Sequence, residues 1–491
     1  MRKFVRLCAP ITNSGGPTKH FAVVVMPWLG TTVPWFSVAI GLILAAKGSR
    51  ISFVGETMPF GENRLRFRFV LLCIRYVLSA VREHCTVLDI RRFTSNVASN
   101  GSKSTSVSRL AVLNAVWEMR GEMWVHGRTR ITDRIRRQLE SSVDLIQSFV
   151  AGNKFDCIVV PGGVYGSSGI WNEVARANSV RLASFDSGGR GILTVATNGI
   201  ASQLQDMPRA FSLLKADIKS VEELTFVRNA ALAELRRRRE GTDRFSSQLR
   251  STASLDTRLN GAVLMALNSP WDSAALGLHS VFDNSAQWIV ETIRYLLAAT
   301  GARVIVRQHP AERFKMSRSS DDYKALIQNQ FGADPRVIFI AAADPVNSYD
   351  LLDIVSVVVV YTSTIGIEAA LNGKIVITPS SSYYSGLGFI WRASSLDQYH
   401  AHIINALAGK YMVTTQMKED ALICYYLTQC CNWVSSPFSP EGFVDWIQMP
   451  FEDLIKHDGV QITSTAIHDD VPTAFLVHLA NARNALRRAQ N

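Results

Sequence analysis

The segment SVVVVYTSTIGIEAALNGKIVITP, residues 356–379, holds two apolar, β-branched runs separated by a polar turn and a helix-length stretch. Short β-branched runs that alternate with helix-length segments are typical of parallel α/β layers. This pattern recurs along most of the chain and therefore predicts the fold class.

The same pattern occurs in both halves of the sequence. Apolar runs of strand length lie at 21–26, 50–56, 85–90, 155–163 and 180–189 in the first half, and at 262–267, 302–308, 336–342, 356–362 and 374–379 in the second. Two Rossmann-like halves in one chain predict two α/β domains with a cleft between them.

The length of 491 residues fits two or three domains. We predict an acceptor domain at 1–235, a donor domain at 257–400 and a mainly helical extension at 401–491, whose role is not readable. Between the two domains, residues 236–256 are rich in charge and serine and are interpreted as a linker.

The composition excludes global disorder, because 47% of the residues are hydrophobic and 19% are charged. A net charge of +11 favours an anionic partner, such as nucleic acid, nucleotide phosphates or an acidic membrane face. The run Arg236–Arg239 lacks interleaved aromatic residues, so we interpret it as a solvated charge run and expect no nucleic acid partner. Seven scattered cysteines without a CxxC pair predict reduced thiols in a cytoplasmic protein, with no zinc site.

Residues 21–46 carry no charge and are long enough to span a membrane. Pro27, Gly30 and Pro34 interrupt the stretch, which favours a strand, a turn and a buried helix instead. The basic start of the chain lacks an apolar region of its own, so a cleaved signal is not expected.

Three polar loops of the second half are predicted to meet at one crevice. Right-handed crossovers and the strand order 3-2-1-4-5 place the ends of the first, second and fourth strands around the switch point, where α/β folds bind ligands. The loops that follow these strands are 268–277, 307–312 and 361–374.

The loop at 361–374 offers hydroxyl groups at a helix start. Thr362, Ser363 and Thr364, with free backbone N–H groups, predict an anion site. Thr364 can also cap the helix while Ser363 binds the anion, so the two interpretations coexist. Glu368 is assigned either to ribose hydroxyls or to a favourable interaction with the helix dipole.

The other two loops add donors and an acid. Arg307 and His309 are predicted to face the same anion, and Pro310 ends the strand. A lone histidine is more often structural, but its neighbours favour ligand contact here. Asp272 lies near the switch point, and either a structural or a binding role stays open for it.

In the first half, a glycine-rich turn at 159–171 contains Gly162, Gly163 and Tyr165, which we assign to an acceptor-side loop. Asp186, in SFDSGGRG at 184–191, is the preferred carboxylate for acid/base or nucleophilic work, because glycines leave it accessible. The alternative is an aspartate that merely stabilises a turn.

The segments VIVRQHPAE, VVVVYTSTIGIEAALNGKIVI and SYYSGLGF resemble the capsule polysaccharide biosynthesis family, which includes bacterial Kdo transferases. FDSGG and TNGIAS, within 185–202, resemble a diverged form of the family's N-terminal acidic–glycine segment. The similarity lies mainly at 155–200 and 262–390. The family's acidic residue is usually glutamate, whereas the matching position here is Asp186.

The resemblance implies a GT-B glycosyltransferase with an activated-sugar donor such as a CMP-linked sugar. His309 and the hydroxyls of Ser363 and Thr364 would hold the nucleotide phosphate, and Glu368 the ribose. No metal-binding DxD motif of the GT-A type occurs at a matching place, so transfer is expected to be metal-independent and to need no cofactor.

We therefore predict a glycosyltransferase that moves a sugar, such as Kdo from CMP-Kdo, to a capsule, surface-polysaccharide or lipid-linked acceptor. The expected location is cytoplasmic, peripheral to an anionic inner membrane face. Two rival hypotheses stay open: a sugar-nucleotide epimerase or polyol-phosphate transferase on the same scaffold, and a non-catalytic nucleotide-binding subunit of an export complex.

Overall fold

The computed structural model describes residues 1–8, 19–28, 31–57, 64–92, 101–123, 129–189, 191–243 and 259–490. The chain divides into two compact units. Unit 1 comprises Met1–Asn114, Arg130–Ala210 and Cys431–Asn491, and unit 2 comprises Ala115–Thr129 and Phe211–Cys430. The end of the chain is thus part of unit 1, so residues 401–491 are shared between the units.

Unit 1 is built on a sheet with the strand order β13-β6-β5-β4-β1-β2-β3. The strands from β5 to β3 are parallel, while β6 and β13 are antiparallel additions at one edge. The strand bounds are β1 His20–Val25, β2 Arg50–Gly55, β3 Thr86–Asp89, β4 Cys157–Pro161, β5 Arg181–Ser187, β6 Ile192–Ala196 and β13 Val434–Ser435.

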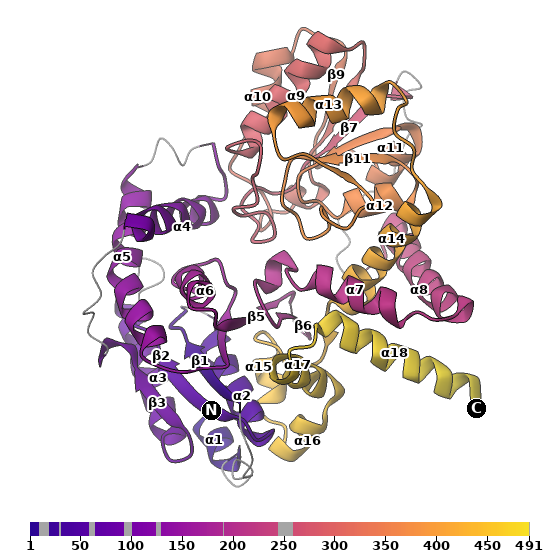
Figure 1. The fold of residues 1–491 in the computed structure, drawn as a ribbon. Coiled ribbons are helices and arrows are strands. Elements are labelled where there is room, and N and C mark those ends of the chain that lie inside the picture. The colour runs from indigo at the N-terminus through magenta and orange to yellow at the C-terminus, as the bar shows by residue number, and fades with distance from the viewer. Residues whose placement is uncertain are drawn as a thin grey trace. The chain divides into compact units, whose positions relative to one another are not determined.

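Helices pack around this sheet (Figure 1). Their bounds are α1 Arg2–Cys8, α2 Val33–Ala46, α3 Arg64–Val81, α4 Gly101–Met119, α5 Thr129–Ala151, α6 Ser168–Ala177, α15 Phe443–Trp446, α16 Phe451–Lys456, α17 Asp458–Asp469 and α18 Thr473–Gln490. α4 begins in unit 1 and ends in unit 2.

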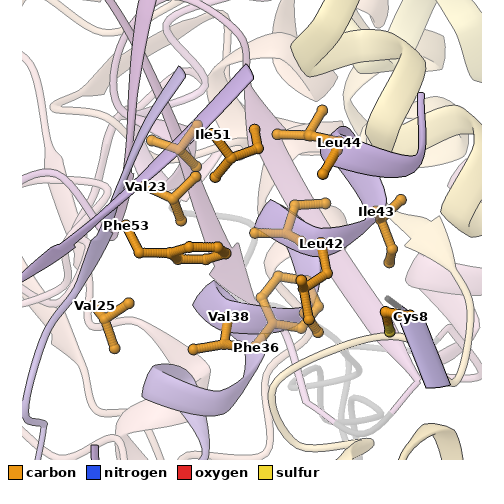
Figure 2. Close-up of a cluster of buried hydrophobic side chains, with 14 of the residues drawn as sticks. Cys8, Val23, Val25, Phe36, Val38, Leu42, Ile43, Leu44, Ile51 and Phe53 are labelled. Carbon is orange, nitrogen blue, oxygen red and sulfur yellow. The ribbon is translucent and has the colours of Figure 1, made fainter. Parts of the chain in front are cut away.

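The uncharged stretch at 21–46 contains β1 and α2, as the sequence predicted, and residues 29 and 30 between them lie outside the described residues. Phe36 and Leu42 of α2 point toward Val23 of β1 and Phe53 of β2 in a shared core (Figure 2). α2 is apolar all round because it is buried on nearly every side. In the part of the chain that the structure describes, no helix is long and apolar enough to cross a membrane.

Unit 2 is built on a sheet with the order β12-β11-β10-β7-β8-β9, and every pairing in it is parallel. Numbered along this half, the order is 6-5-4-1-2-3, so the predicted order 3-2-1-4-5 is confirmed. The strand bounds are β7 Val263–Ala266, β8 Val304–Arg307, β9 Val337–Ile340, β10 Val357–Val360, β11 Ile375–Thr378 and β12 Trp391–Arg392.

The helices of unit 2 connect these strands and extend beyond them, and the first of them, α7, begins in unit 1. Their bounds are α7 Met207–Asp217, α8 Val221–Glu240, α9 Ser285–Ala299, α10 Tyr323–Phe331, α11 Ser348–Ile354, α12 Ile365–Leu371, α13 Leu396–Leu407 and α14 Thr415–Tyr426. Both α8 and α12 pack against α14. The fold class is therefore α/β with two mainly parallel sheets, as predicted.

The first residues of the predicted linker at 236–256 lie in a helix. Residues 236–240 are the last turn of α8, which begins with a capping box at Ser220 and ends at Gly241 in the left-handed conformation. Arginine is a good helix former, and the charge run hid this continuation of the helix. Residues 244–256 lie outside the described residues.

Candidate functional site

The carboxyl ends of β7, β8 and β10 lie side by side in unit 2. Ala266, the last residue of β7, pairs with Arg307 on one side and with Val360 on the other. The loops that follow these strands therefore leave the same edge of the sheet, where parallel α/β sheets bind ligands. The expected convergence of the three loops follows from the observed strand order.

Hydrogen bonds tie these loops together. The Thr362 N–H points to Asn268 Oδ1 at a long 3.5 Å, which links the ends of β10 and β7. Glu312 accepts from Ser269 Oγ at 3.1 Å and from Gln308 Nε2 at 2.8 Å, which links the ends of β7 and β8. Burial raises the pKa of the Glu312 carboxyl.

The partners of Glu312, Ser269 and Gln308, both lie in loops that the sequence marked as polar. No spacing rule predicts which polar residue of one loop will meet which of another, so only the folded chain reveals these pairs.

The hydroxyls of Thr362, Ser363 and Thr364 are half-buried at the end of β10. Among the described residues they form no hydrogen bonds. Thr364 occupies the position before α12 but does not cap it with its side chain, so the alternative capping role is not observed. The three hydroxyls are consequently available to a ligand.

Tyr384 supports this loop from behind. Its Oη donates to the Ser363 carbonyl at 2.7 Å. A Cβ atom at Gly366 would lie 2.7 Å from Tyr384 Oη and 3.0 Å from Val360, so only glycine allows this approach. The glycine in the first turn of α12 thus has a packing reason.

His309 is half-buried at the start of a short 3-10 helix, Pro310–Arg313. Its Nδ1 accepts from the Ala311 N–H at 3.2 Å. Burial, with the charges of Arg238 and Arg307, lowers the pKa of the imidazole to about 4. At neutral pH the ring is therefore uncharged, and because Nδ1 is an acceptor, the proton sits on Nε2 and makes it a donor.

Arg307 does not offer its charge to this edge. The side chain is 2% exposed, and its guanidinium donates to the carbonyls of Ala341 and Val346 and to Ser348 Oγ. Burial lowers the pKa of Arg307 to about 10. The predicted anion contact is replaced by a structural role, which is to hold the loop between β9 and α11.

Glu368 is buried beside Arg238, which the sequence analysis had placed in the linker. The Oε1 atom of Glu368 lies 3.4 Å from Arg238 Nε. This oxygen accepts no hydrogen bond from the described residues. Burial raises the pKa of Glu368, and the nearby Arg238 charge and a hydrogen bond from Tyr349 partly oppose that rise. Arg238 is therefore a residue of this site that sequence reasoning missed.

The neighbours of Arg238 in the arginine run also have partners within unit 2. Arg237 pairs with Glu234, and Arg239 pairs with Asp353 and Asp350. The Arg239 pairs link the end of α8 to α11, whereas the Arg237 pair lies within α8 itself. Arg236, Arg237 and Arg239 are exposed, in agreement with the expected solvated run.

Asp272 and its neighbour Trp271 lie in the loop after β7. The exposed Asp272 accepts from the Ala274 N–H at 3.0 Å, which is a turn-stabilising contact. The Trp271 ring lies under the guanidinium of Arg120, 4.7 Å from its centroid, and its Nε1 lacks a partner among the described residues. The geometry thus supports the structural interpretation of Asp272.

In unit 1, Gly162 and Gly163 follow β4 with φ angles of 69° and 108°, which favour glycine. The Gly162 N–H donates to the Phe185 carbonyl at 2.9 Å, and Tyr165 is half-buried in the same turn. These three predicted residues therefore lie together at the carboxyl end of a central strand.

Asp186 lies within β5 itself and faces Thr194 of β6 in the antiparallel register. Its carboxylate accepts from the Ser187 N–H at 2.8 Å. The Ser187 hydroxyl donates to Glu441, whose pKa is raised by burial. Glu441 is a second carboxylate near this strand end, and no signal in the sequence pointed to it.

Within the ranges that the structure describes, the cysteine and acidic side chains form no metal centre. All seven cysteines are unpaired thiols, in agreement with the sequence interpretation. Across the described ranges, no group of three or more His, Cys, Asp or Glu side chains is arranged to hold a metal ion.

Comparison with known proteins agrees with the resemblance seen in the sequence. Residues 228–421 match the family model described as "Capsule polysaccharide biosynthesis protein", and this range contains β7 to β12 and the loops at their ends. The predicted resemblance is confirmed for this part of the chain. No curated protein sequence matches the chain significantly.

Solved structures with a similar fold include two described as KpsC Kdo transferases from Thermosulfurimonas dismutans. The beta Kdo 2,4 transferase is 18% identical over 55% of this chain and 79% of its own, with a TM-score of 0.38. The beta Kdo 2,7 transferase is 16% identical over 57% of this chain and 79% of its own, with a TM-score of 0.34. The UDP-GlcNAc 2-epimerase of Methanocaldococcus jannaschii is 14% identical over 84% of this chain and 99% of its own, with a TM-score of 0.25.

Proposed function

We propose that the protein is a GT-B glycosyltransferase of capsule or surface polysaccharide biosynthesis, with its nucleotide-sugar site at the carboxyl edge of the unit 2 sheet. One observation carries the proposal. Among the described residues, the edge of unit 2 that matches the capsule family presents three unpartnered hydroxyls at the end of β10 and, at the end of β8, a neutral histidine whose Nε2–H is a donor.

This set of groups suits a nucleotide phosphate. The Nε2–H of His309 and the hydroxyls of Ser363 and Thr364 donate to phosphate oxygens without carrying charge of their own. Preorganised donors of this kind stabilise the negative charge that develops on a leaving nucleotide. Arg238, whose charge depresses the pKa of His309, provides the nearby positive potential that the sequence assigned to Arg307.

Glu368 is assigned to the ribose of the donor. Its Oε1 is buried and accepts no hydrogen bond from the described residues, although a carboxylate oxygen normally accepts at least one. A ribose hydroxyl would satisfy this atom. The Arg238 charge opposes the rise that burial causes in the pKa of Glu368, and so favours the carboxylate form, which is the better acceptor.

The donor is proposed to be a CMP-linked acidic sugar such as Kdo, which follows from the family resemblance. The acceptor, a glycan or lipid-linked glycan, is assigned to unit 1, with Gly162, Gly163 and Tyr165 in the acceptor-side loop. Asp186 is the proposed catalytic carboxylate. Transfer is proposed to need no metal, and the protein to be cytoplasmic and peripheral to the inner membrane face.

A nucleotide panel tests the donor site. The purified protein is heated with CMP, UDP, GDP and CDP, and a ligand at a hundred times its Kd adds about 2.7 kcal/mol to the free energy of unfolding. We expect CMP alone to raise the Tm clearly. No shift with any nucleotide would refute the donor site.

Turnover distinguishes the transferase from its rivals. Transfer from a CMP-sugar, but not from UDP-GlcNAc or CDP-glycerol, supports the proposal over an epimerase or a polyol-phosphate transferase. Asp186→Asn should abolish transfer and leave CMP binding intact. CMP binding without transfer to any lipid-linked glycan would instead favour a non-catalytic binding subunit. Activity that survives EDTA supports metal independence.

A further inference from the structure

Helix α3 of unit 1 exposes an apolar stripe. Leu65, Phe69, Leu72 and Tyr76 are 79%, 67%, 61% and 61% exposed, although large apolar side chains are normally buried. The spacing i, i+4, i+7, i+11 places all four within about 60° of one another around the helix axis. Elsewhere in the described chain, exposed large apolar side chains lie singly or in pairs.

The opposite side of α3 accounts for its place in the fold. Ile74, Val77, Leu78 and Val81 are buried in the unit 1 core. The helix is therefore held by one apolar face and presents a second one outward. The inward face explains folding, and the outward stripe calls for another explanation because exposed contiguous apolar surface is unfavourable in water.

Arginines border the stripe on both sides. By helical geometry Arg66 lies on one flank, and Arg68 and Arg75 lie on the other, and all three side chains are exposed. No Asp or Glu occurs in α3, nor in α1, which packs against α3 and carries the exposed Lys3 and Arg6. The two helices thus contribute only cationic charge to the surface around the stripe, while Asp89 of β3 lies close enough to Arg75 for that charge to lower the pKa of the aspartate.

Arg2 of α1 joins the two helices at this surface. Its guanidinium lies over the Tyr76 ring, 4.3 Å from the ring centroid. This cation–π contact holds a positive charge against the exposed Tyr76 ring, next to the apolar stripe.

We propose that α3, with α1 beside it, docks the protein onto a bilayer surface that contains anionic lipids. The stripe of Leu65, Phe69, Leu72 and Tyr76 enters the interfacial region, and the flanking arginines bind lipid phosphates. This inference rests on one part of the proposed function, the peripheral association with the membrane. It names the surface of the protein that makes the contact.

A second copy of the chain is the competing occupant, because the same spacing also suits a helix pair. A two-fold contact between two α3 stripes would bring Arg66, Arg68 and Arg75 of one copy against those of the other, and neither α1 nor α3 has a carboxylate to compensate. Charge complementarity therefore favours an anionic lipid surface.

Vesicle sedimentation without any nucleotide sugar tests the docking surface separately from the transferase. The purified protein is mixed with phosphatidylcholine vesicles that contain or lack phosphatidylglycerol. We expect binding only to the anionic vesicles, weakened by added salt. Equal binding to both kinds of vesicle, or binding to neither, would overturn the inference whatever the nucleotide assays show.

Two sets of substitutions locate the contact. The variant Arg66→Gln, Arg68→Gln and Arg75→Gln should bind anionic vesicles roughly 100-fold more weakly, because each arginine near the surface contributes about 5-fold. Replacing Leu72 and Phe69 by Gln should reduce binding comparably. Unchanged vesicle binding in either variant contradicts the assignment to α3.

The matched control replaces two exposed apolar residues elsewhere, Met412 and Val444, which are 79% and 64% exposed. Met412→Gln and Val444→Gln should leave vesicle binding unchanged, and the same loss as in the α3 variants would show general stickiness and refute the inference. Light scattering measures the oligomeric state and so tests the competing hypothesis of a dimer formed through α3. A dimer that becomes monomeric in the α3 variant, with vesicle binding retained, would also overturn it.

A conservative probe covers the case in which polar α3 variants fail to fold. Phe69→Trp keeps an aromatic side chain at the centre of the stripe. Its fluorescence should shift to the blue on anionic vesicles and be quenched by brominated lipids. Fluorescence that stays at the wavelength of a water-exposed indole in the presence of bound vesicles would refute the contact.

Discussion

His309 gives the most informative single test of the donor site, because two of its substitutions separate folding from binding. The ring has two functions in the structure: Nδ1 caps the 3-10 helix at Pro310–Arg313, and Nε2 carries the proton that we assign to a phosphate. Asparagine can accept from the Ala311 N–H in the same way, since Asn is a preferred capping residue, but it lacks the reach of Nε2. Alanine removes both functions.

The expected magnitudes follow from these contacts. A hydrogen bond to a charged group contributes about 1.5–3 kcal/mol, so both His309→Asn and His309→Ala should weaken CMP binding roughly 10- to 150-fold. Only His309→Ala loses the cap, which should lower the free energy of unfolding by about 1 kcal/mol. Isothermal titration calorimetry measures the first quantity and urea denaturation the second.

The pH dependence of stability provides an independent check on the same residue. The folded-state pKa of His309 is lowered to about 4 by burial and by Arg238 and Arg307, below the ordinary value. The unfolded chain therefore takes up the proton more readily, and the stability that depends on neutral His309 is full above about pH 6.5 and is lost as pH falls toward 4. His309→Asn should lose less stability over this range than the parent.

Two results would refute this reasoning. Unchanged CMP affinity in both variants would remove His309 from the donor site. CMP affinity that falls only in His309→Ala, in step with its lower stability, would leave the residue with a capping role alone. Between about pH 5.5 and 8, CMP binding should show no inflection from this ring, because it stays neutral throughout.

Three further substitutions probe the surroundings of the site. Arg307→Met should lower the free energy of unfolding by about 3 kcal/mol in urea, since three hydrogen bonds to the following loop are lost, with CMP affinity of the folded protein retained. Glu368→Gln should narrow the affinity difference between CMP and dCMP in calorimetry, and an unchanged difference would argue against a ribose contact. Gly366→Ala should cost about 1–3 kcal/mol in thermal unfolding, because the new Cβ would lie 2.7 Å from Tyr384 Oη, whereas Gly386→Ala meets nothing within 4 Å and should be neutral.

The positions of the strands and the edge where the loops meet could be predicted from the sequence. Buried parallel strands need continuous apolar, β-branched runs, and such runs at 262–267, 302–308 and 356–362 mark β7, β8 and β10 within a residue or two. Because crossovers are right-handed, their order along the chain restricts their order in the sheet. The three polar loops followed from that order without any contact being known.

The partners of individual polar side chains could not be predicted in this way. Arg307 and Arg238 are both arginines in charged segments, and the sequence assigned the first to the anion and the second to a linker. In the folded chain the Arg307 guanidinium donates its hydrogen bonds to carbonyls of the loop at 341–346. Helix α8 places Arg238 next to Glu368.

The physical reason is the separation along the chain between the residues that determine each feature. Strand and helix formation depends on neighbouring residues and on burial, so the periodicity of apolar residues in the sequence predicts where strands and helices form. A hydrogen-bond or ion-pair partner depends on which distant segments pack together, and α8 meets α14 and α12 only in the tertiary structure. The sequence by itself therefore determined the two sheets and the edge on which the loops converge, and the tertiary structure decided which side chains at that edge remain free for a ligand.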